Sequence, residues 1–215
     1  MSLITKNISV HKTARYYIMG KPSEKINSVW IVLHGYGQLA EEFVGYFKTL
    51  HYESTLVIAP EALNRFYIKG FDGKIGATWM TKKDRESEII DYVNYLDSVY
   101  DEVIKYGLLG KVKITVLGFS QGTATACRWI SKGNSKIDRL ILWGGEIPQD
   151  VDFLSAKKLF NSVDLTIVLG DKDEFISEEQ LMKEIKQLNE IKINHMIYRF
   201  NGKHEIKAEV LRQLI

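Results

Sequence analysis

The sequence predicts an α/β fold in which a mostly parallel sheet carries helices on both faces. Short apolar runs without polar alternation recur along the chain, as at 28–33, 139–143 and 165–169, and such runs are typical of strands buried on both faces. Longer segments with helical periodicity separate them, which favours a parallel sheet. The 215 residues include three prolines and no repeat or linker-like tract, so we expect one domain over residues 1–215.

The expected elements begin with two short extended segments, 4–10 and 14–19, which flank a polar turn and indicate an antiparallel pair. Further strands are expected at 28–33, 55–59, 113–117, 139–143, 165–169 and 195–200. Helices are expected at about 39–50, from Thr81 through Val103, at 123–130, from Ser177 onward, and after His204 to the end. The carboxyl ends of parallel strands meet at one edge of such a sheet, where ligands bind.

The segment 61–81 is expected to be an irregular loop, rich in aromatic residues and glycines. Long loops in compact domains are commonly functional. We therefore interpret Phe66, Tyr67, Phe71 and Trp79 as candidate substrate-binding residues. The alternative is that these side chains are ordinary core beneath a long loop.

Composition excludes several kinds of partner. The 29 basic residues nearly balance the 27 acidic ones and form no long basic run, so neither nucleic acid nor an anionic membrane surface is indicated. No apolar run approaches the length of a membrane span, and the start lacks the features of a signal peptide. Together with the single cysteine, Cys127, this favours a cytoplasmic protein. No metal or cofactor motif occurs, and the oligomeric state stays open between monomer and homodimer.

The strongest motif is Gly118-Phe119-Ser120-Gln121-Gly122, which lies between the apolar segment 113–117 and the helical pattern at 123–130. A serine in this strand–turn–helix setting sits on a sharp turn, near the positive end of the helix. The flanking glycines let neighbouring backbone pass close by. We therefore interpret Ser120 as a nucleophile rather than as part of an ordinary glycine-serine turn.

Two further side chains complete a candidate catalytic triad. Of the five histidines, only His204 lies in a glycine-containing loop after the last strand, so it is the candidate general base. Asp171 and Asp173 both follow the strand at 165–169. We assign Asp173 as the carboxylate that orients the base, and expect Asp171 to hydrogen-bond the turn backbone. The chain order Ser, Asp, His is that of the α/β hydrolases.

Four motifs together resemble the phospholipase/carboxylesterase family of α/β hydrolases, which includes bacterial carboxylesterases and acyl-protein thioesterases. They are His34-Gly35-Tyr36-Gly37, Gly118-Phe119-Ser120-Gln121-Gly122, Gly170-x-x-Asp173 and Gly202-x-His204-Glu205-Ile206. The resemblance covers nearly the whole chain and implies an α/β-hydrolase fold. Because only about twenty residues separate the strands at 139–143 and 165–169, we expect no large cap domain.

By this resemblance, the backbone N–H groups of Tyr36 and Gln121 would form an oxyanion hole, and each such donor typically contributes about 3 to 4 kcal/mol to transition-state stabilisation. His34 would orient its own loop. The chain departs from the family's usual pattern at Tyr36, at Glu174 and at 143–146. These departures concern the substrate rather than the chemistry.

The expected function is therefore hydrolysis of carboxylic esters with short to medium acyl chains, through an acyl-enzyme intermediate and with a small-molecule ester as partner. Acyl thioester or lysophospholipid hydrolysis is the alternative within the same chemistry. A non-catalytic binding module on the same fold is a more distant alternative.

Overall fold

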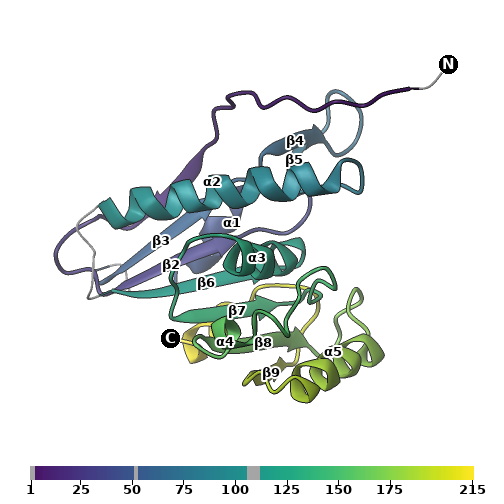
Figure 1. Cartoon of the computed structure of the whole chain (residues 1–215). Helices are drawn as coiled ribbons and strands as arrows, with labels where there is room; N and C mark the ends of the chain where they lie inside the picture. Colours follow the sequence, from purple (N-terminus) through teal and green to yellow (C-terminus); the bar gives the residue numbers. More distant parts are fainter. Residues whose placement is uncertain (1–2, 51–52, 106–111) are drawn as a thin grey trace.

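The computed structural model describes residues 3–50, 53–105 and 112–215. Its main feature is a seven-stranded sheet in the order β1-β3-β2-β6-β7-β8-β9 (Figure 1). β1 is antiparallel to β3, and every other neighbouring pair is parallel. The strands are β1 (Tyr16–Met19), β2 (Ser28–Leu33), β3 (Thr55–Pro60), β4 (Asn64–Tyr67), β5 (Ile75–Thr78), β6 (Lys113–Phe119), β7 (Arg139–Trp143), β8 (Asp164–Gly170) and β9 (Met196–Phe200).

Helices cover both faces of the sheet, as the sequence predicts. They are α1 (Ala40–Phe43), the 3-10 helix η1 (Val44–Phe47), α2 (Arg85–Lys105), α3 (Gln121–Lys132), α4 (Lys157–Phe160), α5 (Glu178–Glu190) and α6 (Ala208–Gln213). Because strand side chains alternate between faces, Ile31 of β2 packs in the layer with α2, α3, α4 and α5. Its neighbour Trp30 packs in the opposite layer with α1, η1 and α6.

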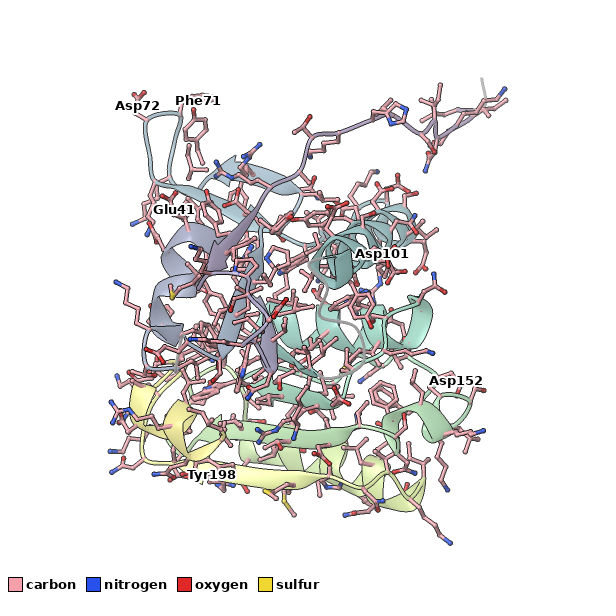
Figure 2. All side chains as sticks on the ribbon, turned by 90° about the vertical axis from the view of Figure 1, so that its left-hand side faces the viewer. Glu41, Phe71, Asp72, Asp101, Asp152 and Tyr198 are labelled. Atoms are coloured by element: carbon pink, nitrogen blue, oxygen red, sulfur yellow. The ribbon has the colours of Figure 1, made fainter. Side chains whose placement is uncertain are left out.

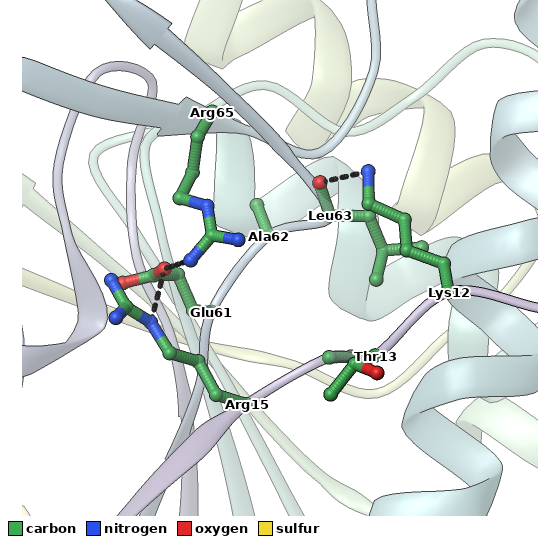
Figure 3. A pocket seen from close by; sticks show the side chains of 8 residues that line it. Lys12, Thr13, Arg15, Glu61, Ala62, Leu63 and Arg65 are labelled. Atoms are coloured by element: carbon green, nitrogen blue, oxygen red, sulfur yellow. Dashed lines mark hydrogen bonds and ion pairs between the residues drawn. The ribbon is translucent and has the colours of Figure 1, made fainter.

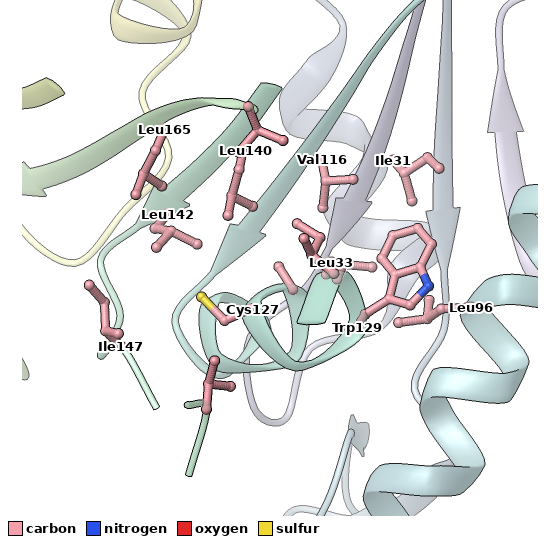
Figure 4. Packing of buried hydrophobic residues seen from close by; sticks show 14 of the residues in the cluster. Ile31, Leu33, Leu96, Val116, Cys127, Trp129, Leu140, Leu142, Ile147 and Leu165 are labelled. Atoms are coloured by element: carbon pink, nitrogen blue, oxygen red, sulfur yellow. The ribbon is translucent and has the colours of Figure 1, made fainter. Parts of the chain in front are cut away.

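The first layer is tightly filled around α3. Figure 4 shows Cys127 and Trp129 of this helix against sheet residues such as Val116 and Leu140. Cys127 is fully buried, and burial raises the pKa of its thiol to about 12. A neutral, enclosed thiol is a packing group and not a nucleophile.

The N-terminal strand pair was predicted wrongly. Within the described residues, 3–15 contain no strand, and β1 pairs instead with β3, where Tyr16 lies opposite Pro60. The side chains of Ile8 and Val10 are 88% and 78% exposed. An isolated strand pair at 4–19 would cover no apolar surface, so pairing there would add little stability. β1 is stable as a strand because it joins the edge of the main sheet at β3.

Three further elements differ from the prediction. The helix expected at 39–50 is the short α1 followed by η1, because Gly45 weakens a continuous helix there by about 1 kcal/mol. α2 begins at Arg85 rather than near Thr81. The short helix α4 was not predicted.

The segment 61–81 is not an irregular loop, because it contains the antiparallel hairpin β4–β5. Gly70 adopts a φ of +60° at its tip, a conformation that glycine tolerates best. In Figure 2, Phe71 and Asp72 mark this tip, which stands out from the body of the protein. Among the helices of the described ranges, none has the length and apolar character that a membrane span requires.

Candidate active site

Ser120 occupies a strained turn between β6 and α3. Its φ and ψ are 54° and −118°, a region that non-glycine residues avoid. The turn is held because the Ser120 N–H donates to the carbonyl of Trp143 at 2.9 Å. It is also crowded: a methyl group on Gly122 would lie 2.2 Å from the carbonyl oxygen of Leu33. Position 122 therefore requires glycine, because the backbone of Leu33 passes too close to leave room for a side chain.

Asp173 and His204 meet at the same edge of the sheet, after β8 and β9. Nδ1 of His204 lies 2.8 Å from Oδ2 of Asp173. The other carboxylate oxygen, Oδ1, accepts from the backbone N–H groups of Phe175 and Ile176 at 2.9 and 3.2 Å. The Asp173 side chain is 1% exposed and that of His204 is 16% exposed. The carboxylate is thus fixed on one side by the backbone and on the other by the imidazole.

Gly144, just after β7, lies close to Asp173 and His204. Its φ is +57°, and a methyl group there would lie 3.3 Å from both Oδ2 of Asp173 and Nδ1 of His204. The His204 ring lies between two aromatic rings, with centroid distances of 4.9 Å to Phe119 and 4.6 Å to Phe175. These contacts leave the imidazole little freedom to turn.

His34, directly after β2, is fully buried and connects two segments. Its Nε2 accepts from the Ala62 N–H at 3.1 Å, so its Nδ1 carries the proton and donates to the Gly35 carbonyl at 2.8 Å. Burial lowers the pKa of His34, although the bond to the Gly35 carbonyl acts in the opposite direction. A neutral imidazole therefore fixes the peptide unit that joins Gly35 to Tyr36.

Charged side chains brace the segment that carries Ala62. Oε1 of Glu61 accepts from Nε of Arg15 at 2.7 Å and lies 3.5 Å from Arg65, as Figure 3 shows. The cavity beside them holds about 10 Å³, room for one water molecule at most. The ion pairs of Glu61 hold the segment whose Ala62 N–H bonds His34. The cavity itself is too small for a substrate.

The loop after β2 also touches Ser120 and the hairpin. A methyl group on Gly35 would lie 3.1 Å from Cβ of Ser120. The Gly37 N–H donates to the Ala77 carbonyl at 2.8 Å, which ties the loop to β5. Tyr36 itself is 63% exposed, and its ring packs on Phe66 of β4 at a centroid distance of 5.2 Å.

Gln121, the first residue of α3, joins the Ser120 turn to the hairpin through its side chain. Oε1 accepts from the Trp79 N–H at 3.1 Å, and Nε2 donates to the Met80 carbonyl at 3.0 Å. Its backbone N–H belongs to the first turn of the helix, where donors lack intrahelical partners. That N–H lies next to Ser120, at the positive end of the helix.

A cleft of about 270 Å³ opens at this edge of the sheet. Ser120, Gln121 and His204 all line it. The remaining lining residues are Thr123, Ala124, Gly144, Gly145, Glu146, Phe175 and Ile176. Within the described residues, no group of three His, Cys, Asp or Glu side chains is arranged to hold a metal ion.

The sequence profile described as Phospholipase/Carboxylesterase matches residues 16–215. The chain belongs to the phospholipase/carboxylesterase family. It is therefore an α/β hydrolase of the esterase and thioesterase type. A search of the curated proteins found no match to the chain.

Solved structures similar to this phospholipase/carboxylesterase-family chain share its fold. Acyl-protein thioesterase 2 of Zea mays has a TM-score of 0.71 at 16% identity, with 94% of this chain and 96% of that chain covered. A carboxylesterase from Mesorhizobium loti has a TM-score of 0.69 at 16% identity, covering 94% and 93%. The Bacillus cereus carboxylesterase has a TM-score of 0.67 at 14% identity, covering 94% and 91%. These likenesses support an α/β-hydrolase fold without a large cap.

The aromatic residues expected to bind substrate are not among those that line the cleft. Trp79 is 1% exposed, and its indole N–H donates to the His34 carbonyl at 2.8 Å, so it is a core residue that supports the His34 loop. Phe66 packs on Tyr36, while Tyr67 and Phe71 are 51% and 89% exposed on the hairpin. The glycines of this segment belong to the hairpin, with Gly70 at its tip and Gly76 in β5.

Two other expectations need revision. Asp171 was expected to hydrogen-bond the turn backbone, but its carboxylate accepts from Nε of Arg199 at 2.9 Å. Asp173 makes the turn bonds as well as the bond to His204. The lining residues Glu146 and Phe175 were missed as site residues. The only sequence signal was that they belong to, or lie beside, the departures from the family pattern at 143–146 and at Glu174.

Proposed function

We propose that the protein hydrolyses carboxylic esters with short to medium acyl chains, with Ser120 as nucleophile, His204 as general base and Asp173 as the carboxylate that orients it. One observation carries this proposal: Ser120 and His204 line one cleft, and the buried Asp173 holds Nδ1 of His204 at 2.8 Å. Since Nδ1–H donates to Asp173, Nε2 keeps its lone pair and can accept the serine proton.

In the first half of the reaction, the Ser120 hydroxyl transfers its proton to Nε2 of His204 while Oγ attacks the ester carbon. The tetrahedral intermediate collapses, the bond to the alcohol oxygen breaks, and His204 returns the proton to that oxygen. In the second half, a water molecule attacks the acyl-enzyme by the same route and releases the acid. No cofactor takes part in this scheme.

The backbone N–H groups of Tyr36 and Gln121 are proposed to hold the negative oxygen of both intermediates. Support comes from the Gly35 peptide, which His34 orients beside Ser120, and from the position of Gln121 in the first turn of α3. Removing one such donor typically costs about 10²- to 10³-fold in kcat.

The preference for small acyl groups is supported by the size of the cleft. Its volume of about 270 Å³ lies just below the usual range of drug-sized ligand pockets. The chain between β7 and β8 carries only the four-residue helix α4, so no deep lid covers a long chain there. We also propose a cytoplasmic location, supported by the single cysteine, which is buried and unpaired.

The test compares wild type with Ser120→Ala on p-nitrophenyl acetate, butyrate, octanoate and palmitate, with labelling by a fluorophosphonate probe. We expect wild type to favour the shorter esters and to be labelled, and the variant to lose about 10⁶-fold in kcat. Ser131→Ala is the matched control, because Ser131 lies on the same helix and its hydroxyl donates to the Arg128 carbonyl, away from the cleft residues.

Three outcomes would contradict the proposal. A rise in kcat/KM out to palmitate contradicts the acyl preference. Faster turnover of acyl thioesters or lysophospholipids at equal chain length favours the alternative substrate classes. Absence of both labelling and hydrolysis favours a non-catalytic binding module.

A further inference from the structure

Glu146 is the one carboxylate among the residues that line the described cleft. It follows the Gly144-Gly145 turn at the end of β7, and a methyl group on Gly145 would lie 2.3 Å from the Ser120 carbonyl oxygen. The Glu146 carbonyl accepts from Oγ1 of Thr123 at 3.1 Å. Its backbone is therefore fixed next to the nucleophile turn.

The Glu146 side chain is exposed, and within the described part of the chain no hydrogen bond or ion pair satisfies its carboxylate. Nearby acidic groups behave differently: Asp150 is bound by Arg128 and Arg85, and Glu174 lies 3.3 Å from Nζ of Lys203. An uncompensated negative charge therefore stands at the cleft.

A second acidic side chain lies close to Glu146. Glu184 of α5 is 5% exposed. Burial, with a smaller contribution from the charge of Glu146, raises the pKa of Glu184, while bonds from Gln180 and from the Ile147 N–H act in the opposite direction. Glu184 thereby also holds the residue that follows Glu146.

Phe175 adds an aromatic face to the same cleft. Its side chain is 73% exposed although it lies over the His204 ring, with centroids 4.6 Å apart. Its backbone N–H donates to Oδ1 of Asp173 at 2.9 Å, so the carboxylate that orients His204 also positions Phe175. Such an exposed ring, held in place by its backbone, is available to a ligand.

We propose that Glu146 and Phe175 form a subsite for a cationic group, so that the preferred substrates are esters carrying an ammonium group within a few bonds of the scissile carbonyl. A carboxylate attracts a cation directly, and an aromatic face attracts it through its quadrupole. A long alkyl chain in the same place would strip water from an unpaired carboxylate, which is unfavourable. The inference rests on the proposed function, because it assigns the substrate class of that same cleft.

The experiment uses two pairs of esters that differ only in charge. The first pair is butyrylcholine and 3,3-dimethylbutyl butyrate, in which the cation lies in the alcohol. The second is p-nitrophenyl 4-(trimethylammonio)butyrate and p-nitrophenyl 5,5-dimethylhexanoate, in which it lies in the acyl group. We expect the cationic member of at least one pair to have a kcat/KM about tenfold higher at low ionic strength, and the ratio to fall as salt is added.

Three variants connect this ratio to the subsite. Glu146→Gln removes the charge at constant size and should bring the ratio close to 1. Phe175→Leu keeps an apolar side chain but removes the aromatic face, and should lower the ratio by a smaller factor, about threefold. Glu24→Gln removes an exposed carboxylate that precedes β2, at the opposite end of the parallel strands, and should leave the ratio unchanged.

Equal kcat/KM within both pairs for wild type would overturn the inference, and so would a preference that Glu146→Gln retains. In either case the neutral esters would still be hydrolysed, and the proposed function would stand. If wild type hydrolysed none of the four esters and was not labelled by the fluorophosphonate, the proposed function would fail and the subsite with it.

Discussion

Nδ1 of His34 lies 2.8 Å from the carbonyl oxygen of Gly35, which shares a peptide unit with the N–H of Tyr36. Because a trans peptide is planar, its carbonyl and its N–H point in opposite directions. The histidine that holds the carbonyl therefore sets the direction of the N–H. A buried side chain that need not touch the substrate can in this way position a proposed oxyanion donor.

Two variants of His34 separate its two bonds. In His34→Asn the amide nitrogen can take the place of Nδ1 and still donate to Gly35, whereas in His34→Gln the amide group reaches the place of Nε2, near Ala62. We expect His34→Gln to lose about 10²-fold in kcat and His34→Asn to lose less than about tenfold, both with little change in KM. Unfolding in urea controls for the cavity that each variant creates. Equal losses in kcat at equal stability would mean that the orientation of the Gly35 peptide is not what matters.

Replacing Ser120 by glycine should make the protein more stable and inactive. The residue has a φ of 54°, and its side chain makes no capping bond to α3, so glycine relieves the backbone strain without removing a helix cap. We expect the free energy of unfolding to rise by about 1 kcal/mol. Ser120→Ala, which keeps the strain, should show no such rise in denaturant titrations. Identical stabilities of the two variants would argue against strain at this turn.

The two aspartates after β8 should differ sharply in their effect on turnover. Asp173→Asn removes the carboxylate that fixes the tautomer of His204, and should cost about 10⁴-fold in kcat, by analogy with a serine protease. Asp171→Asn affects only an exposed pair with Arg199, so its kcat should stay within about twofold and its stability within about 1 kcal/mol. The comparison needs both variants to be folded, which circular dichroism checks. A larger loss of turnover in Asp171→Asn would reverse the assignment.

The sequence predicts the centre of the main sheet well because β2, β3, β6, β7 and β8 are buried on both faces. Each of these strands is mainly apolar, and burial of such a run tolerates few alternatives, whereas the edge strand β9 is largely exposed. The positions of Ser120, Asp173 and His204 at strand ends follow from the same parallel arrangement. These features depend on local patterns and on one topological rule.

The remaining features depend on contacts between distant segments. Whether Ile8 or Tyr16 forms a strand is decided by the edge of β3, which no local pattern specifies. The lining positions of Glu146 and Phe175 follow from turns held by Thr123 and Asp173. No sequence pattern near Glu146 or Phe175 indicates these partners.

Trp79 shows how such a contact changes an interpretation, and its replacement tests the result. Because it is buried and bonded to the His34 carbonyl, Trp79→Ala should lower the free energy of unfolding by about 3–5 kcal/mol, rather than raise KM selectively. Phe71→Ala, at an exposed tip of the same hairpin, should change it by less than about 0.5 kcal/mol. Chemical denaturation measures both. A stable Trp79→Ala variant with only a raised KM would return this residue to the substrate site.

Asp150 connects the loop after β7 to two helices, and its contribution should depend on pH. The Arg128 side chain is 7% exposed and lies 2.8 Å from Asp150, as does Arg85. Burial alone would raise the pKa of Asp150, but the bonds from the two arginines outweigh it and lower the pKa from 3.8 to about 2. A carboxyl group with a lowered pKa stabilises the fold above its unfolded pKa, and this contribution is lost as the pH falls.

Asp150→Asn should therefore cost about 3 kcal/mol at pH 7, because it leaves the buried Arg128 charge without its partner. The difference in free energy of unfolding between wild type and variant should shrink as the pH falls from about 4 towards about 2. Asp164→Asn is the matched control, since its exposed pair with Lys113 should be worth less than about 1 kcal/mol at any pH. Urea titrations between pH 7 and pH 3 measure both differences. A difference for Asp150→Asn that stays constant over this range would show that its carboxylate does not stabilise the fold through its charge.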